Sequence, residues 1–289
     1  MRITVAIATI RRPEVLDETV RRLAGQTEPP AAVVLSCVDV DDVSAATRAL
    51  PSVTVVTGPK GLPRQRNRAA DAAADADVVV FLDDDVALAP DYLARARAFA
   101  EARPDVPAFF GDVLADGILV GGLSWETADS RIAARPPAGD AALDPAPELY
   151  GCNMVVRRTT LDAVRFDDRL PGYAWLEDVD FSRRCRALGP VGQYRGCQMV
   201  HLGVPSGRQR GLPHGYSQVA NPLYLWQKGV VRFPQAVRYF GRPLLKNAVF
   251  SLRDPSGGLV DRRGRLRGNA LALLDAARGR VRPERTLDL

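Results

Sequence analysis

Long hydrophobic runs are missing from this chain. No uninterrupted apolar stretch reaches the roughly 18 to 20 residues that a membrane-spanning helix needs. The first residues, 1–5, enter a predicted strand at once and lack the charged-then-apolar layout of a signal peptide. We therefore expect a cytoplasmic protein. Its 289 residues, of which 46% are hydrophobic and 25% charged, suffice for one large α/β domain, alone or with an appendage.

Cysteine is scarce, and its spacing excludes further classes of protein. The chain has no C-x-x-C pair, which argues against a zinc site and against a disulfide framework, and we expect reduced thiols. No G-x-G-x-x-G motif follows the first predicted strand, so a classical dinucleotide-binding fold is disfavoured. There is no recognisable nucleic-acid module and no internal repeat, so no nucleic-acid partner is expected. The four cysteines are Cys37, Cys152, Cys185 and Cys197.

The net charge of +5 is distributed unevenly. Residues 228–289 hold 14 Lys/Arg and 5 Asp/Glu, which gives 14 − 5 = +9 and leaves 5 − 9 = −4 for residues 1–227. A basic tail behind an acidic body favours an anionic neighbour, such as lipid headgroups or a lipid-diphosphate acceptor. A solvated, arginine-rich surface with no partner remains the alternative. Peripheral attachment to the inner face of the cell membrane is compatible with this tail.

The first hundred residues alternate between the periodicities of strands and of helices. Such alternation implies right-handed crossovers and a mostly parallel, Rossmann-like sheet flanked by helices. The expected strands cover 3–7, 32–37, 53–57 and 78–82, and the expected helices cover 14–25, 43–50, 63–76 and 91–102.

The remainder of the chain is less regular. The patterns predict strands over 108–114 and 153–157, two short strands within 191–200, and helices over 178–188 and 266–277. Residues 125–149 are rich in Ala, Pro and Asp and are expected to form a loop. Beyond residue 203 the chain is rich in Gly, Pro and Arg. We expect a domain over 1–205 and a helical or irregular basic extension over 206–289, which would make acceptor or membrane-surface contacts.

Three consecutive carboxylates, Asp83, Asp84 and Asp85, follow the apolar run 78–82. A short apolar run of this kind is typical of a strand that is buried on both faces. Open α/β sheets bind their ligands at the carboxyl ends of such strands. Carboxylates this close raise one another's pKa unless a cation neutralises them, and oxygen ligands suit a hard divalent ion. An Asp-rich turn before the helix that begins near Pro90 and Asp91 is the alternative interpretation.

A second acidic cluster, Glu177, Asp178 and Asp180, opens the predicted helix 178–188. Backbone N–H groups and the macrodipole at a helix start favour a charged carboxylate there. Asp180 stands three and four residues before Arg183 and Arg184, a spacing typical of helix ion pairs. One carboxylate of Glu177 and Asp178 suffices as a cap, which leaves the other available for chemistry.

The two clusters belong to a longer series of motifs. In chain order these are Thr9-Ile10-Arg11-Arg12-Pro13, Asp39, Arg66-Asn67-Arg68-Ala69, Phe81-Leu82-Asp83-Asp84-Asp85, Gly151-Cys152-Asn153, Phe166-Asp167 and Glu177-Asp178-Val179-Asp180-Phe181-Ser182-Arg183. Over residues 2 to 205 the series resembles the family 2 glycosyltransferases of GT-A fold. The resemblance departs from the family pattern at Arg11, where many members carry Asn.

The resemblance implies roles on the donor side. Thr9, Arg12 and Asp39 would line the pocket for the base and ribose, although Asp41 is an equally placed carboxylate for the base contact. Arg66 and Asn67 would approach the nucleotide from their helix. The acidic triplet would serve the donor and its ion, with Asp83 at the ribose or the metal shell, Asp84 beside the donor and Asp85 as the ligand of a divalent cation, Mn²⁺ or Mg²⁺.

The resemblance also implies the remaining site residues. Asp178 would be the catalytic base, and His201 matches a histidine that completes the metal shell in some members. A lone histidine after a strand is otherwise a hydrogen-bonded core residue. Trp175, Tyr173 and Trp125 could stack on sugar rings, or belong to the core, and Glu177 stands with them on the acceptor side.

These residues predict an inverting, metal-dependent glycosyltransferase. It would move a sugar from a nucleotide-diphosphate donor to the hydroxyl of a glycan or lipid-linked acceptor, in glycan, polysaccharide or glycolipid biosynthesis. A nucleotidyltransferase that makes nucleotide sugars is the main alternative, but the turn Thr9–Pro13 lacks the glycines it usually needs. A phosphatase is disfavoured by Ala87, where its Asp-x-Asp motif expects Thr or Val. An inactive sugar-nucleotide-binding module is disfavoured because both acidic clusters are intact.

Overall fold

The structure, a computed structural model, describes residues 1–135, 142–172, 174–204, 211–252 and 260–289. Backbone contacts divide the chain into two compact units. The first comprises 1–60, 65–166 and 181–207, and the second comprises 61–64, 167–180 and 208–289. The second unit therefore includes the segment that carries Asp178. The predicted functional division after residue 205 stays a prediction.

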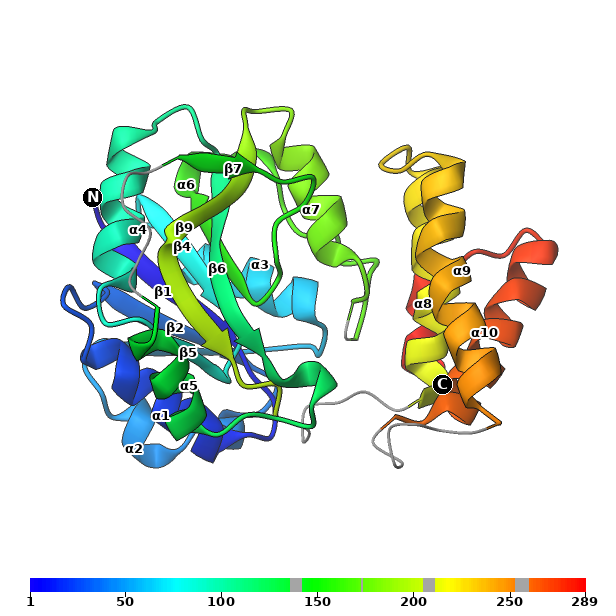
Figure 1. Cartoon of the computed structure of the whole chain (residues 1–289), viewed down its shortest axis with the longest axis horizontal. Coiled ribbons are helices and arrows are strands. Elements are labelled where there is room, and N and C mark those ends of the chain that lie inside the picture. The colour runs from blue at the N-terminus through cyan, green and yellow to red at the C-terminus, as the bar shows by residue number, and fades with distance from the viewer. Residues whose placement is uncertain (136–141, 173, 205–210, 253–259) are drawn as a thin grey trace. The chain divides into compact units, whose positions relative to one another are not determined.

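The first unit is built on one mixed sheet. Its strand order is β3-β2-β1-β4-β8-β6-β9-β5, with β7 paired to β9 (Figure 1). The run β3-β2-β1-β4 is parallel, as predicted, and β6 is parallel to β9, whereas β8, β5 and β7 add antiparallel pairs. The strands are β1 Ile3–Ala8, β2 Ala32–Cys37, β3 Val53–Thr57, β4 Val78–Leu82, β5 Val86–Leu88, β6 Ala108–Asp116, β7 Leu143–Pro145, β8 Asn153–Arg157 and β9 Val191–His201.

Helices cover both faces of this sheet, which explains why β4 reads as a continuous apolar run. Alternate β4 residues, such as Val80, pack into a cluster with residues of α1 and α4. The intervening residues, such as Phe81, pack into a second cluster with residues of α3, α6 and α7. All five β4 residues are buried. The helices are α1 Pro13–Ala24, α2 Ala45–Arg48, α3 Leu62–Ala72, α4 Tyr92–Ala102, α5 Trp125–Ala133, α6 Arg158–Ala163 and α7 Glu177–Cys185.

Two sequence-based expectations for the first unit are wrong. Residues 125–149 were expected to form a loop, but they contain α5 and β7. Ser124 caps α5 by accepting a hydrogen bond from the Thr127 N–H at 3.2 Å, and Ala128 packs into a small apolar cluster with Val200. The two short strands expected over 191–200 form the single strand β9, whose pairing with β6 shifts register twice. The local composition could not reveal the apolar cluster against which α5 packs or the strand β6 with which β9 pairs.

The second unit is a helical bundle of α8 Gly211–Gln227, α9 Phe233–Phe250 and α10 Arg262–Ala277, followed by the short 3₁₀ helix Pro283–Asp288 (Figure 1). The sequence predicts α10, but α8 and α9 are missed because each contains glycine and an internal proline, Pro222 in α8 and Pro243 in α9. Burial stabilises α8 despite its proline, since nearly all of its residues are buried.

A buried amide network fixes the rotation of the three long helices. Asn247 of α9 donates to Gln218 of α8 at 2.8 Å and to Asn269 of α10 at 2.9 Å. Asn269 in turn donates to the Gly215 carbonyl at 2.7 Å. Because a buried amide without these partners would be costly, the network selects one helical register.

Within the part of the chain that the structure describes, no helix is both long enough and apolar enough to cross a membrane.

Candidate active site

Strand register gathers the acidic triplet and His201 at one edge of the sheet. Asp83, Asp84 and Asp85 connect β4 to β5, and Val86 of β5 pairs with His201, the last residue of β9. The same histidine pairs with Asp116, the last residue of β6. Residues that are far apart in sequence thus meet because their strands end side by side, as the sequence predicts for the triplet and His201.

Asp83, Asp85 and His201 form a cluster with the geometry of a metal site. Each offers one ligand atom, and these atoms lie within 4.8 Å of one another. The His201 Nε2 atom is 3.2 Å from Asp85 Oδ1 and 3.6 Å from Asp83 Oδ2. Two carboxylates and an imidazole are a donor set suited to Mn²⁺ and to related divalent ions, so the residues present fit such an ion.

The protonation of His201 reflects its acidic surroundings. Burial lowers its pKa, but hydrogen bonds to Asp116 and Asp85 outweigh burial and raise it to about 10. For Asp85, burial acts to raise the pKa, yet the hydrogen bond and charge of His201 hold it below its usual value. A cation bound to Nε2 would take the place of the ring proton that neutralises these carboxylates.

Asp116 is a site residue that the sequence reasoning missed. Its Oδ1 lies 3.2 Å from His201 Nδ1, so the carboxylate orients the ring with Nε2 toward Asp85. Burial raises the Asp116 pKa, while hydrogen bonds from His201 and Tyr150 lower it to about 2 overall. The sequence does show an acidic residue two positions beyond the predicted strand 108–114. Its contact with His201 follows only from the pairing of β6 with β9.

Asp84 is not one of the three residues of this cluster and forms a buried pair with Arg12, which also lies 3.4 Å from Asp85. Its Oδ2 accepts a hydrogen bond from Thr9 Oγ1 at 2.6 Å, its Oδ1 is bound by the Arg12 guanidinium, and its carbonyl accepts from Thr19. Burial raises the Asp84 pKa to about 7 against the opposing effects of Arg12 and Thr9. These contacts tie the turn after β1 to the acidic triplet, and the donor-binding roles of the three residues stay predictions.

The loop after β2 is organised by Asp42 rather than by the two carboxylates weighed for base contact. Asp42 is buried and accepts from the N–H groups of Arg11 and Asp39 at 2.7 and 2.9 Å. Asp39 and Asp41 are exposed, and Asp39 caps the 3₁₀ turn by accepting from the Asp41 N–H. Both exposed carboxylates therefore remain candidates for the donor base.

Arg66 and Asn67 are neighbours on helix α3, but their side chains make different contacts. Arg66 is buried, donates to the Gly151 carbonyl at 2.6 Å and lies 3.5 Å from Asp83 Oδ1. Asn67 exchanges two hydrogen bonds with the backbone of Phe166, at 2.9 and 3.0 Å. Arg66 thus places positive charge beside the cluster, whereas Asn67 has a structural role, and its predicted donor contact stays a prediction.

In the second unit, Glu177 and Asp178 begin α7 after a strained turn. Ala174 and Leu176 both adopt left-handed backbone conformations, with φ of 54° and 69°. Such conformations each cost about 1 kcal/mol or more in residues other than glycine, and they concentrate at functional sites. Glu177 is buried and Asp178 is partly accessible. The backbone around the predicted catalytic base is therefore held in an unusual conformation.

Trp175 lies between Ala174 and Leu176 in this turn. Its carbonyl accepts a hydrogen bond from Asn221 of α8 at 2.8 Å, and its ring lies edge-to-face with His214 at 5.8 Å. The buried indole Nε1 has no hydrogen-bond partner among the described residues. Tyr173, the neighbouring aromatic, lies outside the described residues. In the first unit, the Trp125 ring packs beneath the Arg22 guanidinium at 4.6 Å.

Lys228 secures the segment that carries Asp178. Its Nζ atom lies 2.6 Å from Asp167 Oδ2 and 2.7 Å from Asp180 Oδ1, and Tyr224 also donates to Asp167. Asp180 is fully buried. The sequence interpretation of Asp180 as a partner of Arg183 and Arg184 omitted this cation, which is 48 residues away along the chain.

We expect Lys228→Met to lower the free energy of unfolding by about 2 kcal/mol, because it removes a cation that bridges two shielded carboxylates. Burial raises the Asp167 pKa, but Lys228 and Tyr224 hold it below its usual value. A depressed carboxylate pKa stabilises the fold at neutral pH, so the difference from wild type should shrink in acid. Denaturant unfolding of both proteins, at neutral pH and in acid, measures this difference in the free energy of unfolding. Lys246→Met, at an exposed position of α9, is the matched control, and equal losses in the two variants would contradict the prediction.

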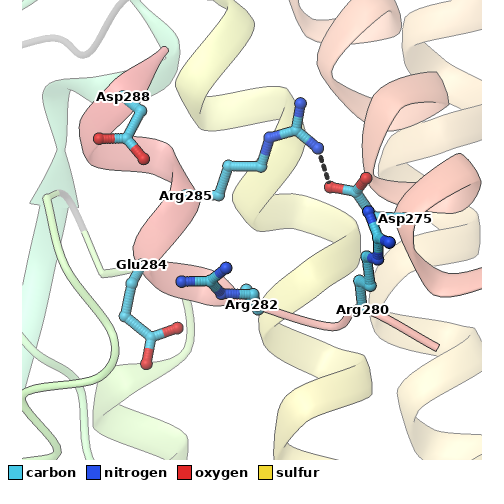
Figure 2. Close-up of a pocket in the computed structure, with 6 residues that line it drawn as sticks. All are labelled: Asp275, Arg280, Arg282, Glu284, Arg285 and Asp288. Atoms are coloured by element: carbon cyan, nitrogen blue, oxygen red, sulfur yellow. Dashed lines mark hydrogen bonds and ion pairs between the residues drawn. The ribbon is translucent and has the colours of Figure 1, made fainter. Parts of the chain in front are cut away.

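A cavity of about 340 Å³ lies beside the C-terminal 3₁₀ helix of the second unit. Figure 2 shows its lining, in which Arg285 pairs with Asp275. Outside that view, Tyr216 donates a hydrogen bond to Asp275 at 2.9 Å. The lining carries three arginines and three carboxylates, so the cavity has no net charge that would select an anion. Its residues are Asp275, Arg280, Arg282, Glu284, Arg285 and Asp288.

The helix-flanked mixed sheet has the GT-A fold, and the family to which the chain belongs makes it a glycosyltransferase. The chain belongs to the glycosyltransferase-like family 2, whose family model matches residues 1–200. The family and fold predicted from the motifs are thereby confirmed. No curated protein sequence matches the chain.

Solved structures support the fold. TarS 1-349 of S. aureus is similar with a TM-score of 0.54 and 15% identity, over 97% of this chain and 82% of that one. For the same protein in complex with UDP-GlcNAc the TM-score is 0.55 and the identity 14%, over 97% of this chain and 93% of that one. For GalNAc-T7 with UDP, GalNAc and Mn²⁺ the TM-score is 0.60 and the identity 15%, over 100% of this chain and 56% of that one. At these identities the similarity concerns the fold alone.

Proposed function

We propose that this protein is an inverting, divalent-cation-dependent glycosyltransferase that moves a sugar from a nucleoside-diphosphate donor to an acceptor hydroxyl. The observation that carries the proposal is the Asp83–Asp85–His201 cluster at the sheet edge of a family 2 chain. Solved structures of the same fold hold UDP-GlcNAc in one case and UDP with Mn²⁺ in another. A UDP-sugar is therefore the first donor to test.

The donor side is assigned to residues of the first unit. Asp83, Asp85 and His201 would hold the cation, and Asp116 would orient the histidine ring. A bound divalent ion supplies a Lewis acid that stabilises negative charge on the leaving diphosphate. Arg12, 3.4 Å from Asp85, offsets the carboxylate charge that would otherwise repel an anionic donor. Asp39 or Asp41 would contact the base from the loop after β2.

The acceptor side is assigned to the segment before and at the start of α7. In an inverting transfer the acceptor hydroxyl attacks the anomeric carbon from the face opposite the leaving group, and it must lose a proton as it does so. Asp178 is proposed to accept this proton. The Trp175 indole N–H, which has no hydrogen-bond partner within the described part of the chain, and the buried Glu177 carboxylate support a role for this segment in binding acceptor hydroxyls.

A glycan or a lipid-linked sugar is the proposed acceptor class. Either presents the hydroxyl groups that carboxylates and an indole N–H can bind. Placement of the reaction in glycan, polysaccharide or glycolipid biosynthesis follows from that class. Inactivity toward every soluble sugar acceptor, combined with activity on lipid-linked ones, would assign the lipid-linked class.

We expect Mn²⁺-dependent release of a nucleoside diphosphate when the protein is incubated with its donor sugar nucleotide. Incubation with a panel of UDP-, GDP- and dTDP-sugars, with Mn²⁺, Mg²⁺ or EDTA, and quantification of the free diphosphate measure this. A nucleotidyltransferase would instead form nucleoside triphosphate from the sugar nucleotide only when pyrophosphate is added. Pyrophosphate-dependent turnover, or transfer that is unaffected by EDTA, would overturn the proposal in its present form.

A further inference from the structure

The outer face of α9 combines an apolar stripe with a basic row. Phe233, Val237, Leu245 and Val249 follow one another at multiples of four residues, and all four are exposed. We call these four residues the α9 apolar stripe. Arg238, Arg242 and Lys246 follow the same spacing one residue later, and all three are exposed. We call them the α9 basic row. Residues four apart are neighbours on a helix surface, so the stripe forms one ridge that winds along α9 and the row forms the ridge beside it.

The opposite face of α9 is committed to the bundle. Ala236 and Asn247 are buried, and Asn247 joins the amide network with α8 and α10. Figure 1 shows α9 alongside both helices. Rotation of α9 to bury the apolar stripe would break this network, so the exposure of the stripe is a fixed property of the unit.

The apolar surface continues past both ends of the stripe. The ring of Trp226, at the end of α8, lies 4.9 Å from that of Phe233 and is itself exposed. Leu252, just after α9, is 88% exposed, the highest value among the large apolar side chains described. A continuous series of exposed large apolar residues is unusual on a monomeric protein and indicates a docking surface.

The charge around this surface has one sign. Residues 211–252 contain five Lys/Arg and no Asp or Glu, so their net charge is 5 − 0 = +5. A second copy docked through α9 about a two-fold axis would bring the same basic row against itself, which disfavours a dimer. An anionic lipid surface meets both needs, since headgroups neutralise the basic row and the acyl boundary takes up the apolar stripe.

We propose that the α9 apolar stripe and basic row form a docking surface for an anionic lipid bilayer. The helix lies in the plane of the interface, with Trp226 and Phe233 as aromatic anchors at one end. This surface goes beyond the proposed glycosyl transfer, because no residue of it belongs to the donor, metal or acceptor sites. It would hold the enzyme beside lipid-linked acceptors.

Flotation with vesicles tests the proposal. We expect the full chain to float with vesicles of 70% phosphatidylcholine and 30% phosphatidylglycerol, and to bind far less to pure phosphatidylcholine. Each basic residue near such a surface is worth about fivefold in binding, so the combined Arg238→Gln, Arg242→Gln and Lys246→Gln variant should lose on the order of 100-fold. A Leu245→Ser and Val249→Ser variant should also detach, because it removes apolar surface from the stripe.

Controls separate docking from misfolding and from catalysis. Leu188→Ser and Arg131→Gln change exposed residues of the first unit and should leave flotation unchanged. Circular dichroism and donor-binding measurements on the α9 variants should match those of wild type, so failure of this proposal leaves the proposed function standing. Equal flotation of the α9 variants and wild type, or no flotation with anionic vesicles, would overturn it. A dimer in light scattering that the same variants dissolve would assign the surface to a second copy instead.

Discussion

Asp178→Asn should lower the turnover number by about 10³- to 10⁴-fold while leaving donor affinity nearly unchanged. The substitution keeps the size and hydrogen-bonding shape of the side chain but removes its ability to accept a proton. General base catalysis by a positioned carboxylate contributes roughly 10² to 10⁴ in rate. Steady-state kinetics with saturating donor and acceptor measure the turnover, and calorimetry measures donor affinity in the presence of Mn²⁺.

The matched control for this prediction is Asp162→Asn. Asp162 is an exposed carboxylate of α6 that pairs with Arg158 at the surface, so the control makes the same change of charge away from either acidic cluster. Its kinetics should equal those of wild type. Turnover of Asp178→Asn within a few-fold of wild type would remove Asp178 as the base. A parallel loss of donor affinity would instead indicate that Asp178 serves the donor.

The outcome for Asp178 also bears on the second unit. Residues 167–180 group with the C-terminal helices, and Lys228, Tyr224 and Asn221 hold that segment by side-chain contacts. The basic extension is thus more than a surface appendage, because it secures the motif that carries the proposed base. We expect substitutions at these three positions to reduce turnover more than they reduce donor affinity.

The sequence predicts those features that depend on local pattern. The strand 153–157 and the helix 266–277 follow from periodicity and composition, and the structure has them as β8 and within α10. The acidic triplet and His201 could be predicted because the motif order points to them. Asp116 and Lys228 could not, because their importance lies in partners 85 and 48 residues away that only the folded chain brings within reach.

Helices α8 and α9 escaped prediction for a different physical reason. Proline and glycine lower helix propensity, so Pro222 and Pro243 argue against helices when each segment is judged alone. Tertiary burial overrides this cost in α8, whose residues are almost all buried. In α9 the buried amide network through Asn247 offsets the cost of the proline, while the outer face of the helix stays exposed. Packing of this kind depends on the other helices and has no signature in a single segment.

Asp85→Ala should abolish cation-dependent donor binding. Asp85 is nearly fully buried, lies 3.2 Å from His201 Nε2 and accepts a hydrogen bond from the Val204 N–H at 2.7 Å. Its removal leaves one carboxylate and one imidazole, too few protein ligands to retain a divalent ion against water. We expect Mn²⁺ to raise donor affinity in wild type and to have no effect in the variant, as calorimetric titrations with Mn²⁺ or EDTA would measure.

The control distinguishes loss of the cation from damage to the sheet. Asp112→Asn alters another shielded carboxylate on β6, the strand that carries Asp116, but outside the cluster. It should keep the full Mn²⁺ response. Since Asp85 also contacts Arg12, the variant could lower stability, so thermal unfolding must show that Asp85→Ala remains folded at the assay temperature. A folded Asp85→Ala protein with an undiminished Mn²⁺ response would exclude this cluster as the cation site, and with it the donor-side chemistry proposed for the enzyme.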